Sequence, residues 1–251
     1  MTTVLAFFAH PDDAEFLCAG TLALLHASGA KIHLATMTAG DGGSAELPPE
    51  EIARIRLQEA AQAAALLDGE HHCAGAQDLL IAYDPLNIRR VTEIVRRIKP
   101  DIVFTHSPQD YLLDHEITSQ LVRAACFAAS VLNVRTNEAN AAPATQSIPH
   151  LFYADAIEGR DIFGQPVVPA FYVNITDAMA TKETMLACHA SQREWLRRQH
   201  GLDQYLVAMR EWSAQRGSEC GVAYAEAFRQ HLGHAHPSNN VLAELIGVLK
   251  P

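Results

Sequence analysis

The sequence predicts an α/β fold with a doubly wound, mainly parallel β-sheet and helices on both of its faces. The first observation is a short apolar run at residues 4–9, which is typical of a buried strand. The second is that strand-like and helix-like segments then alternate, an order that favours a parallel sheet. The third is that neither an internal repeat nor a linker divides the 251 residues, so we expect one domain over 1–251.

The first half of the chain contains most of the predicted sheet and its helices. The predicted segments are strands at 4–9, 31–37 and 101–105, a short strand or loop within 71–82, and helices at 14–27, 48–67, 87–98 and 114–131. The helix at 48–67 has an apolar face that includes Ile52, Ala60 and Leu67. In the common strand order 3-2-1-4-5, the first and fourth strands are neighbours.

The second half of the chain has a different character. Residues 136–147 are rich in Ala, Asn, Thr and Pro and predict a loop, and strands are expected at 150–156 and 170–175. From about residue 177 we expect a helical C-terminal part, with helices over 177–206 and 221–232.

The composition excludes several classes of protein. With 19 Lys and Arg against 29 Asp and Glu, the net charge is −10, which argues against a nucleic-acid partner. No apolar run approaches the roughly 20 residues of a membrane span, and no basic stretch precedes the first apolar run as in a signal peptide. Five cysteines without a Cys-x-x-Cys pair indicate reduced thiols, so we expect a cytoplasmic protein.

Residues able to bind a metal follow two of the predicted strands. His-Pro-Asp-Asp at 10–13 comes directly after the first strand, and His115 lies in the segment after the fourth. If these strands are neighbours, His10, Asp13 and His115 face one cavity at the carboxyl ends of the strands. Two imidazoles and a carboxylate suit Zn²⁺ and leave a fourth position for water.

Asp12 is the predicted general base. Adjacent side chains point in different directions, so Asp12 is expected to stay free at the edge of a site that Asp13 occupies, ready to take a proton from water. The alternative is that Asp12 or Asp13 caps the following helix, and that Asp114 caps the next one. Two such motifs, each after a parallel strand, favour the metal site.

Residues 9–15, Ala-His-Pro-Asp-Asp-Ala-Glu, resemble the signature of the LmbE-like (PIG-L) metal-dependent N-deacetylases. Arg56-x-x-Glu59, Lys-Pro-Asp at 99–101, residues 110–115 and parts of 175–192 extend the resemblance. It implies a Rossmann-like fold and a zinc-dependent hydrolase. The implied reaction removes an N-acetyl group from an aminosugar of the N-acetylglucosamine type, or from its conjugate.

The same resemblance implies a role for individual residues. His10, Asp13 and His115 match the zinc ligands, and Asp12 matches the base for a zinc-activated water. In addition, Arg56 matches a substrate-binding position, and Asp114 matches a residue that orients catalytic groups. An amidase acting on a non-sugar N-acyl substrate, and a non-catalytic sugar- or metal-binding relative, are the alternatives. A small N-acetylated molecule is the expected partner, and association into a homo-oligomer is compatible with the sequence.

One position departs from the family pattern. The family often has His-Pro-Asp-His in the second loop, where the first His assists the oxyanion, but this chain has Leu112 there. Either zinc alone polarises the carbonyl, or another group takes the place of that histidine. His106, Tyr111 and His189 are the candidates, and all three are predicted to contact the substrate. Asp78 either contacts sugar hydroxyl groups or is a turn residue.

Two further pairs of histidines lie outside these motifs. His71-His72 and His234-x-His236 could suggest a second metal site. Because neither pair has an evident carboxylate or cysteine partner in the sequence, we expect both pairs in surface loops.

Overall fold

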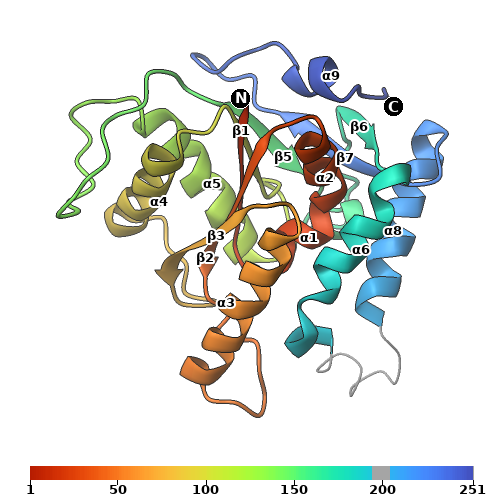
Figure 1. Ribbon diagram of the computed structural model, residues 1–251, viewed down its shortest axis with the longest axis horizontal. Coiled ribbons are helices and arrows are strands. Elements are labelled where there is room, and N and C mark those ends of the chain that lie inside the picture. Colours follow the sequence, from red (N-terminus) through yellow and green to blue (C-terminus); the bar gives the residue numbers. More distant parts are fainter. Residues whose placement is uncertain (194–203, 251) are drawn as a thin grey trace.

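The computed structural model describes residues 1–193 and 204–250. Within these ranges a seven-stranded sheet, in the order β3-β2-β1-β4-β5-β7-β6, forms the centre of the molecule (Figure 1). The strands are β1 (Thr3–Phe8), β2 (Lys31–Thr38), β3 (Glu70–Ala76), β4 (Ile102–Thr105), β5 (His150–Ala154), β6 (Phe171–Asn174) and β7 (Ala225–Gln230). The pairs among β1 to β5 are parallel, and β7 runs antiparallel to both β5 and β6. The predicted doubly wound, mainly parallel sheet is thus confirmed, including the order 3-2-1-4-5.

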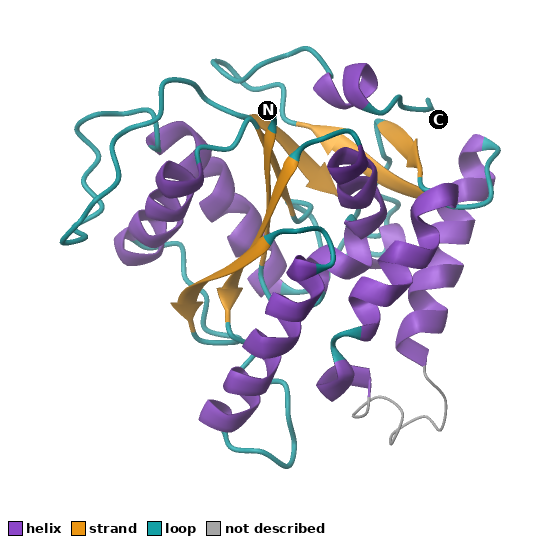
Figure 2. Cartoon of the chain, in the orientation of Figure 1, coloured by secondary structure: helices purple, strands orange, loops and turns teal. Residues whose placement is uncertain are grey.

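Helices cover both faces of this sheet (Figures 1 and 2). They are α1 (Asp13–Leu17), α2 (Ala19–Ala27), α3 (Pro49–Ala65), α4 (Pro85–Ile98), α5 (Leu113–Ala128), α6 (Met179–Ala187), α8 (Gln204–Cys220) and α9 (Val241–Leu245), with short 3₁₀ turns at Ile157–Gly159 and Thr176–Ala178. One apolar core joins the sheet to α2 and α6, and a second joins it to α4 and α5. The sheet therefore separates two cores, as expected for a doubly wound fold.

The interior strand β1 shows why two cores form. Its residues alternate between the faces, so Val4 and Phe8 enter one core while Leu5 and Phe7 enter the other, and all four are fully buried. A strand covered on both faces needs a continuous apolar sequence, and residues 4–9 supply it.

Two predicted helices differ from the structure. The segment expected to be one helix over 14–27 is broken at Cys18, where the backbone leaves helical geometry (φ −145°). The helix expected over 221–232 is wrong, because residues 225–230 form strand β7. Ala, Glu, Gln and Arg favour a helix locally, but the ladders of β5 and β6 provide pairing on both sides, and Phe228 packs in the core. Residues 194–203 of the helix expected over 177–206 lie outside the described residues.

The loop expected at 136–147 is confirmed, whereas one pair of histidines lies elsewhere than expected. His71 and His72 belong to strand β3 and not to a surface loop, while His234 and His236 do lie in a loop.

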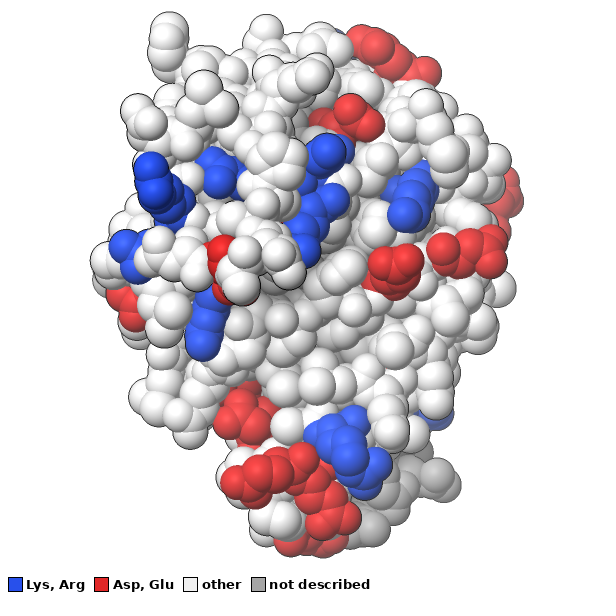
Figure 3. Space-filling model, turned by 60° about the vertical axis from the view of Figure 1, so that its left-hand side comes forward, with Lys and Arg blue, Asp and Glu red and all other residues white. Residues whose placement is uncertain are grey.

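No helix of the described part combines the length and apolar character that a membrane crossing requires. On the face drawn in Figure 3, Lys and Arg groups are interspersed with Asp and Glu and with uncharged surface.

Candidate active site

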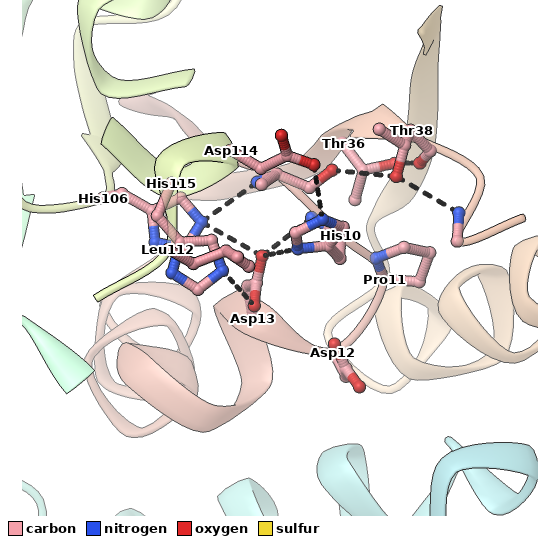
Figure 4. Close-up of polar contacts among 12 residues, drawn as sticks. His10, Pro11, Asp12, Asp13, Thr36, Thr38, His106, Leu112, Asp114 and His115 are labelled. Atoms are coloured by element: carbon pink, nitrogen blue, oxygen red, sulfur yellow. Dashed lines mark hydrogen bonds and ion pairs between the residues drawn. The ribbon is translucent and has the colours of Figure 1, made fainter. Parts of the chain in front are cut away.

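Two loops at the carboxyl ends of neighbouring strands form the site. Strands β1 and β4 pair in parallel, so residues 9–13 after β1 lie beside residues 106–115 after β4. Asp12 has a left-handed backbone (φ 105°), and this sharp turn leads directly into α1 at Asp13. Figure 4 shows the result: Asp13 points among the imidazoles of His10, His106 and His115, and Asp12 points away from them.

The predicted metal ligands converge. One ligand atom from each of His10, Asp13 and His115 lies within 4.8 Å of the others. His10 Nδ1 is 3.3 Å from one Asp13 oxygen, and His115 Nε2 is 3.6 Å from the other. Bonds of about 2.0–2.1 Å to a tetrahedral ion place ligand atoms roughly 3.3 Å apart, so these spacings suit such an ion. The donor set therefore fits a divalent metal such as zinc.

A buried carboxylate contacts each of His10 and His115 at the ring nitrogen that is turned away from Asp13. Asp114 Oδ2 lies 3.3 Å from His10 Nε2, and Asp110 Oδ1 lies 2.9 Å from His115 Nδ1. A carboxylate behind the imidazole is the usual partner of a metal-ligating histidine, since it sets the tautomer and the ring orientation. The resemblance to the family implies an orienting role for Asp114 but none for Asp110, although Asp110 stands in the same motif.

The charges at the cluster are matched to a cation. Burial alone would raise the pKa of Asp13, but the imidazoles of His115, His106 and His10 outweigh it and hold this pKa well below its usual range. Burial likewise opposes protonation of His10, yet Asp13 and Asp114 raise the pKa of His10 to about 10. The cluster thus attracts a positive charge, which a proton or a metal ion can provide.

Asp12 belongs to a separate group of contacts on the same cavity. Its carboxylate lies 3.4 Å from Arg56 Nη2 and is hydrogen-bonded by Tyr205. Arg56 also donates to the carbonyl oxygens of Pro11 (2.6 Å) and Gly40 (3.4 Å), so it connects the loop after β1 to the loop after β2 that contains Gly40. Burial raises the pKa of Asp12, while Arg56 acts to lower it. A carboxyl with a raised pKa next to a cation site can accept and return a proton near neutral pH.

A cavity of about 300 Å³ opens over this cluster. Its lining residues are His10, Asp12, Asp13, Arg56, Tyr111, Leu112, His115, Gln192 and Tyr205. Tyr205 and Gln192 were not predicted, because α8 and the segment after α6 reach the site only through the tertiary fold. Leu112 occupies the wall at the position where the family often has a histidine.

The residues predicted to contact substrate divide into two groups. Tyr111 and Arg56 line the cavity, whereas Asp78, His106 and His189 are not among its lining residues. Asp78 accepts a hydrogen bond from Gly42 N (2.9 Å) and so joins two loops.

The two remaining histidines are buried behind the site. His106 lies 3.0 Å from Asp13 Oδ2 and stacks on His115, with the ring centroids 3.9 Å apart. His189 faces Glu15, with 3.3 Å between Nε2 and Oε1, and burial opposes its protonation while Glu15 raises its pKa. These positions indicate support of the ligands and of α1 more than contact with substrate.

Comparison with known proteins adds to this geometry. Residues 5–126 match the family model described as PIG-L, GlcNAc-PI de-N-acetylase. A 4-oxalmesaconate hydratase of Pseudomonas putida is 24% identical over 200 residues, which is 76% of this chain and 74% of the hydratase. A 1D-myo-inositol 2-acetamido-2-deoxy-alpha-D-glucopyranoside deacetylase of Corynebacterium diphtheriae is 28% identical over 145 residues, or 45% of this chain. That match spans only 50% of the deacetylase.

A solved structure shows the same fold over almost the whole chain. The N,N'-diacetylchitobiose deacetylase of Pyrococcus horikoshii superposes on this chain with a TM-score of 0.78 at 24% sequence identity. The superposition covers 96% of this chain and 88% of that one. At this identity the likeness establishes the fold, and the residues of the site must carry the chemistry.

Proposed function

Since this chain belongs to the PIG-L (LmbE-like) family, we propose that it is a zinc-dependent N-deacetylase, which hydrolyses the N-acetyl group of an aminosugar of the N-acetylglucosamine type or of its conjugate. The observation that supports this most directly is one cavity that holds both the His10, Asp13 and His115 cluster and the separate carboxylate of Asp12. A volume of about 300 Å³ is at the lower end of the range for small-ligand sites, which suits a single sugar ring.

The proposed roles follow from the contacts. His10, Asp13 and His115 would hold the zinc ion, whose chemistry when bound is to polarise the acyl carbonyl and to acidify water. Asp12 takes the proton of the attacking water and then returns it to the departing amine. Arg56 and Tyr205 hold the Asp12 carboxylate in place, so the base keeps its direction during both transfers. Asp114 and Asp110 orient the two histidines.

Tyr111 and Arg56 remain the proposed substrate contacts, because both line the cavity. Side chains of Asp78, His106 and His189 are proposed to support the site from behind. The five free cysteines agree with the expected cytoplasmic location.

The test is acetate release from N-acetylglucosamine and its conjugates by the zinc-loaded protein, compared with the same protein after chelation. We expect release that depends on the metal and is lost in a His115→Ala variant, which removes one proposed ligand. Metal-independent release, or no release from any N-acetylated sugar, would contradict the proposal.

A hydratase reaction is the second candidate, and a specific observation favours it. The Pseudomonas putida hydratase matches 76% of this chain, whereas the Corynebacterium diphtheriae deacetylase matches 45%. Leu112 also replaces the histidine that commonly assists the oxyanion in deacetylases. Incubation with 4-oxalmesaconate, with its consumption followed by chromatography, separates the two functions: a hydratase consumes it, and an N-deacetylase leaves it unchanged.

A further inference from the structure

We propose that His33, Glu70 and His72 form a second binding site for a divalent transition-metal ion, on strands β2 and β3 and apart from the active site. One imidazole or carboxylate atom of each residue lies within 4.8 Å of the other two. This site does not depend on the reaction proposed above, because none of its residues lines the catalytic cavity.

The strand register brings the three side chains together. β2 and β3 pair in parallel, with His33 opposite Glu70 and Ala35 opposite His72. Side chains along a strand alternate between the faces, so His33, Glu70 and His72 share one face. His71 points to the other face, where its Nε2 lies 3.3 Å from Thr36 Oγ1. The register therefore supplies the carboxylate and the second imidazole that the His71-His72 pair lacks in the sequence.

The distances suit a metal ion. His33 Nδ1 and His72 Nε2 are 3.1 Å apart, and His72 Nε2 is 3.9 Å from Glu70 Oε2. Ligand atoms around a tetrahedral ion with bonds of about 2.0–2.1 Å are roughly 3.3 Å apart. The two imidazoles are thus already close to that spacing. The side chain of Glu70 is exposed, so it can rotate to shorten the distance between its carboxylate and His72.

The electrostatics of the cluster favour ligation. Burial is the largest cause acting on the pKa of His33 and of His72; Lys31 also lowers both pKa values and Glu70 acts in the opposite direction. The net effect lowers both pKa values, which favours the neutral form of each ring. A neutral imidazole offers one nitrogen lone pair to a metal, whereas a protonated ring offers none. For both rings to bind the ion, the hydrogen bond between His33 Nδ1 and His72 Nε2 is given up and the ring that donates it changes tautomer. Glu70 supplies the negative charge, and Lys31 is the charged group that opposes a cation here.

The donor set and the position indicate what the site would do. Two imidazoles with one carboxylate suit Zn²⁺, Ni²⁺, Co²⁺ or Cu²⁺, and three protein ligands leave room for water. His33 and Glu70 lie near the amino ends of their strands, whereas the catalytic cluster follows the carboxyl ends. β3 is one of the two edge strands of the described sheet, so a shared ion would fasten this edge to β2.

Zinc binding to a protein without catalytic ligands tests the site. In a His10→Ala/His115→Ala background, equilibrium dialysis followed by elemental analysis is expected to find one zinc ion per chain. His72→Gln or Glu70→Gln in that background should weaken affinity at least tenfold, since even losing a partner of a ligand costs about 10- to 100-fold. His71→Gln is the matched control, because it removes the neighbouring imidazole on the opposite face and should leave affinity unchanged.

Thermal unfolding with and without zinc gives an independent readout. Zinc should raise Tm in the background and in the His71→Gln control, but not in the His72→Gln protein. Absence of a bound ion in the background, or equal affinity with and without His72 and Glu70, would overturn the proposal. If His72→Gln loses its native circular dichroism spectrum, the exposed Glu70→Gln change decides, because it removes a ligand without altering the core. Acetate release is not measured, so failure here leaves the proposed deacetylase reaction unaffected.

Discussion

Replacement of Asp12 by Asn separates proton transfer from metal binding. Asn has the same shape, tolerates the left-handed backbone at this position (φ 105°) and can still accept from Tyr205, but it cannot act as a base at neutral pH. Loss of a general base costs about 10²- to 10⁴-fold in rate. At about 1.4 kcal/mol per tenfold, this corresponds to roughly 3–5 kcal/mol of activation free energy. Bound zinc should stay unchanged, because the proposed ligand set does not include Asp12.

The stability of this variant should fall only moderately. The change removes one charge from a buried pair in which Asp12 Oδ1 and Arg56 Nη2 are 3.4 Å apart. Arg56 keeps its hydrogen bonds to the carbonyls of Pro11 and Gly40, so the loss should be about 1.5–3 kcal/mol, as for a hydrogen bond to a charged group.

The assay combines acetate release, zinc content and urea unfolding. Asp68→Asn is the matched control, since Asp68 also has a positive φ (49°) but lies at the surface after α3. An Asp12→Asn protein that retains its zinc and more than a tenth of the activity would refute the assignment of the base. Loss of zinc in the same variant would refute the separation of Asp12 from the ligand set.

Three further predictions concern the orientation of His10, the buried ion pair of Lys182 and Glu226, and the dependence of stability on pH. Asp114→Asn should weaken zinc affinity about 10- to 100-fold, because Asp114 orients His10; equilibrium dialysis would show unchanged affinity if that role is wrong. Glu226→Gln should destabilise the fold by about 3–5 kcal/mol in urea unfolding, because it leaves the buried Lys182 ammonium, 2.6 Å from Glu226, without a counter-charge; Lys182→Met in addition should restore part of the loss. Burial lowers the pKa of His71 from 6.5 to about 4, so the unfolded chain binds this proton more readily and stability should fall as pH is lowered from 6.5 to 4, by at most about 1.4 kcal/mol per pH unit. A His71→Gln protein with the same acid sensitivity as the wild type would contradict that attribution.

Much of the candidate site could be predicted from short segments. An apolar strand followed at once by His-Pro-Asp-Asp places polar groups at a strand end, where ligands bind in such sheets. The geometry agrees for His10, Asp13 and His115, which the structure brings together. For Asp114, the contact with His10 agrees with an orienting role.

Other parts of the site depended on contacts between distant residues. Tyr205 reaches Asp12 from α8, and neither its spacing nor its neighbours in the sequence indicate this. Asp110 could have been found, because it precedes His115 by five residues in the same loop and such a ligand needs a carboxylate behind it. His106 and His189 were considered for substrate contact, but their burial behind the cavity follows only from packing.

By itself, the sequence determined the alternation of strands and helices, the two motifs at strand ends and the types of ligand they contain, because these depend on residues close together in the chain. The tertiary structure alone decided that residues 225–230 are a strand and that His33 and Glu70 stand beside His72. Strand pairing joins segments far apart in sequence, and the hydrogen bonds and burial that it provides outweigh local helix preference. The same long-range pairing turns separate histidines and carboxylates into clusters.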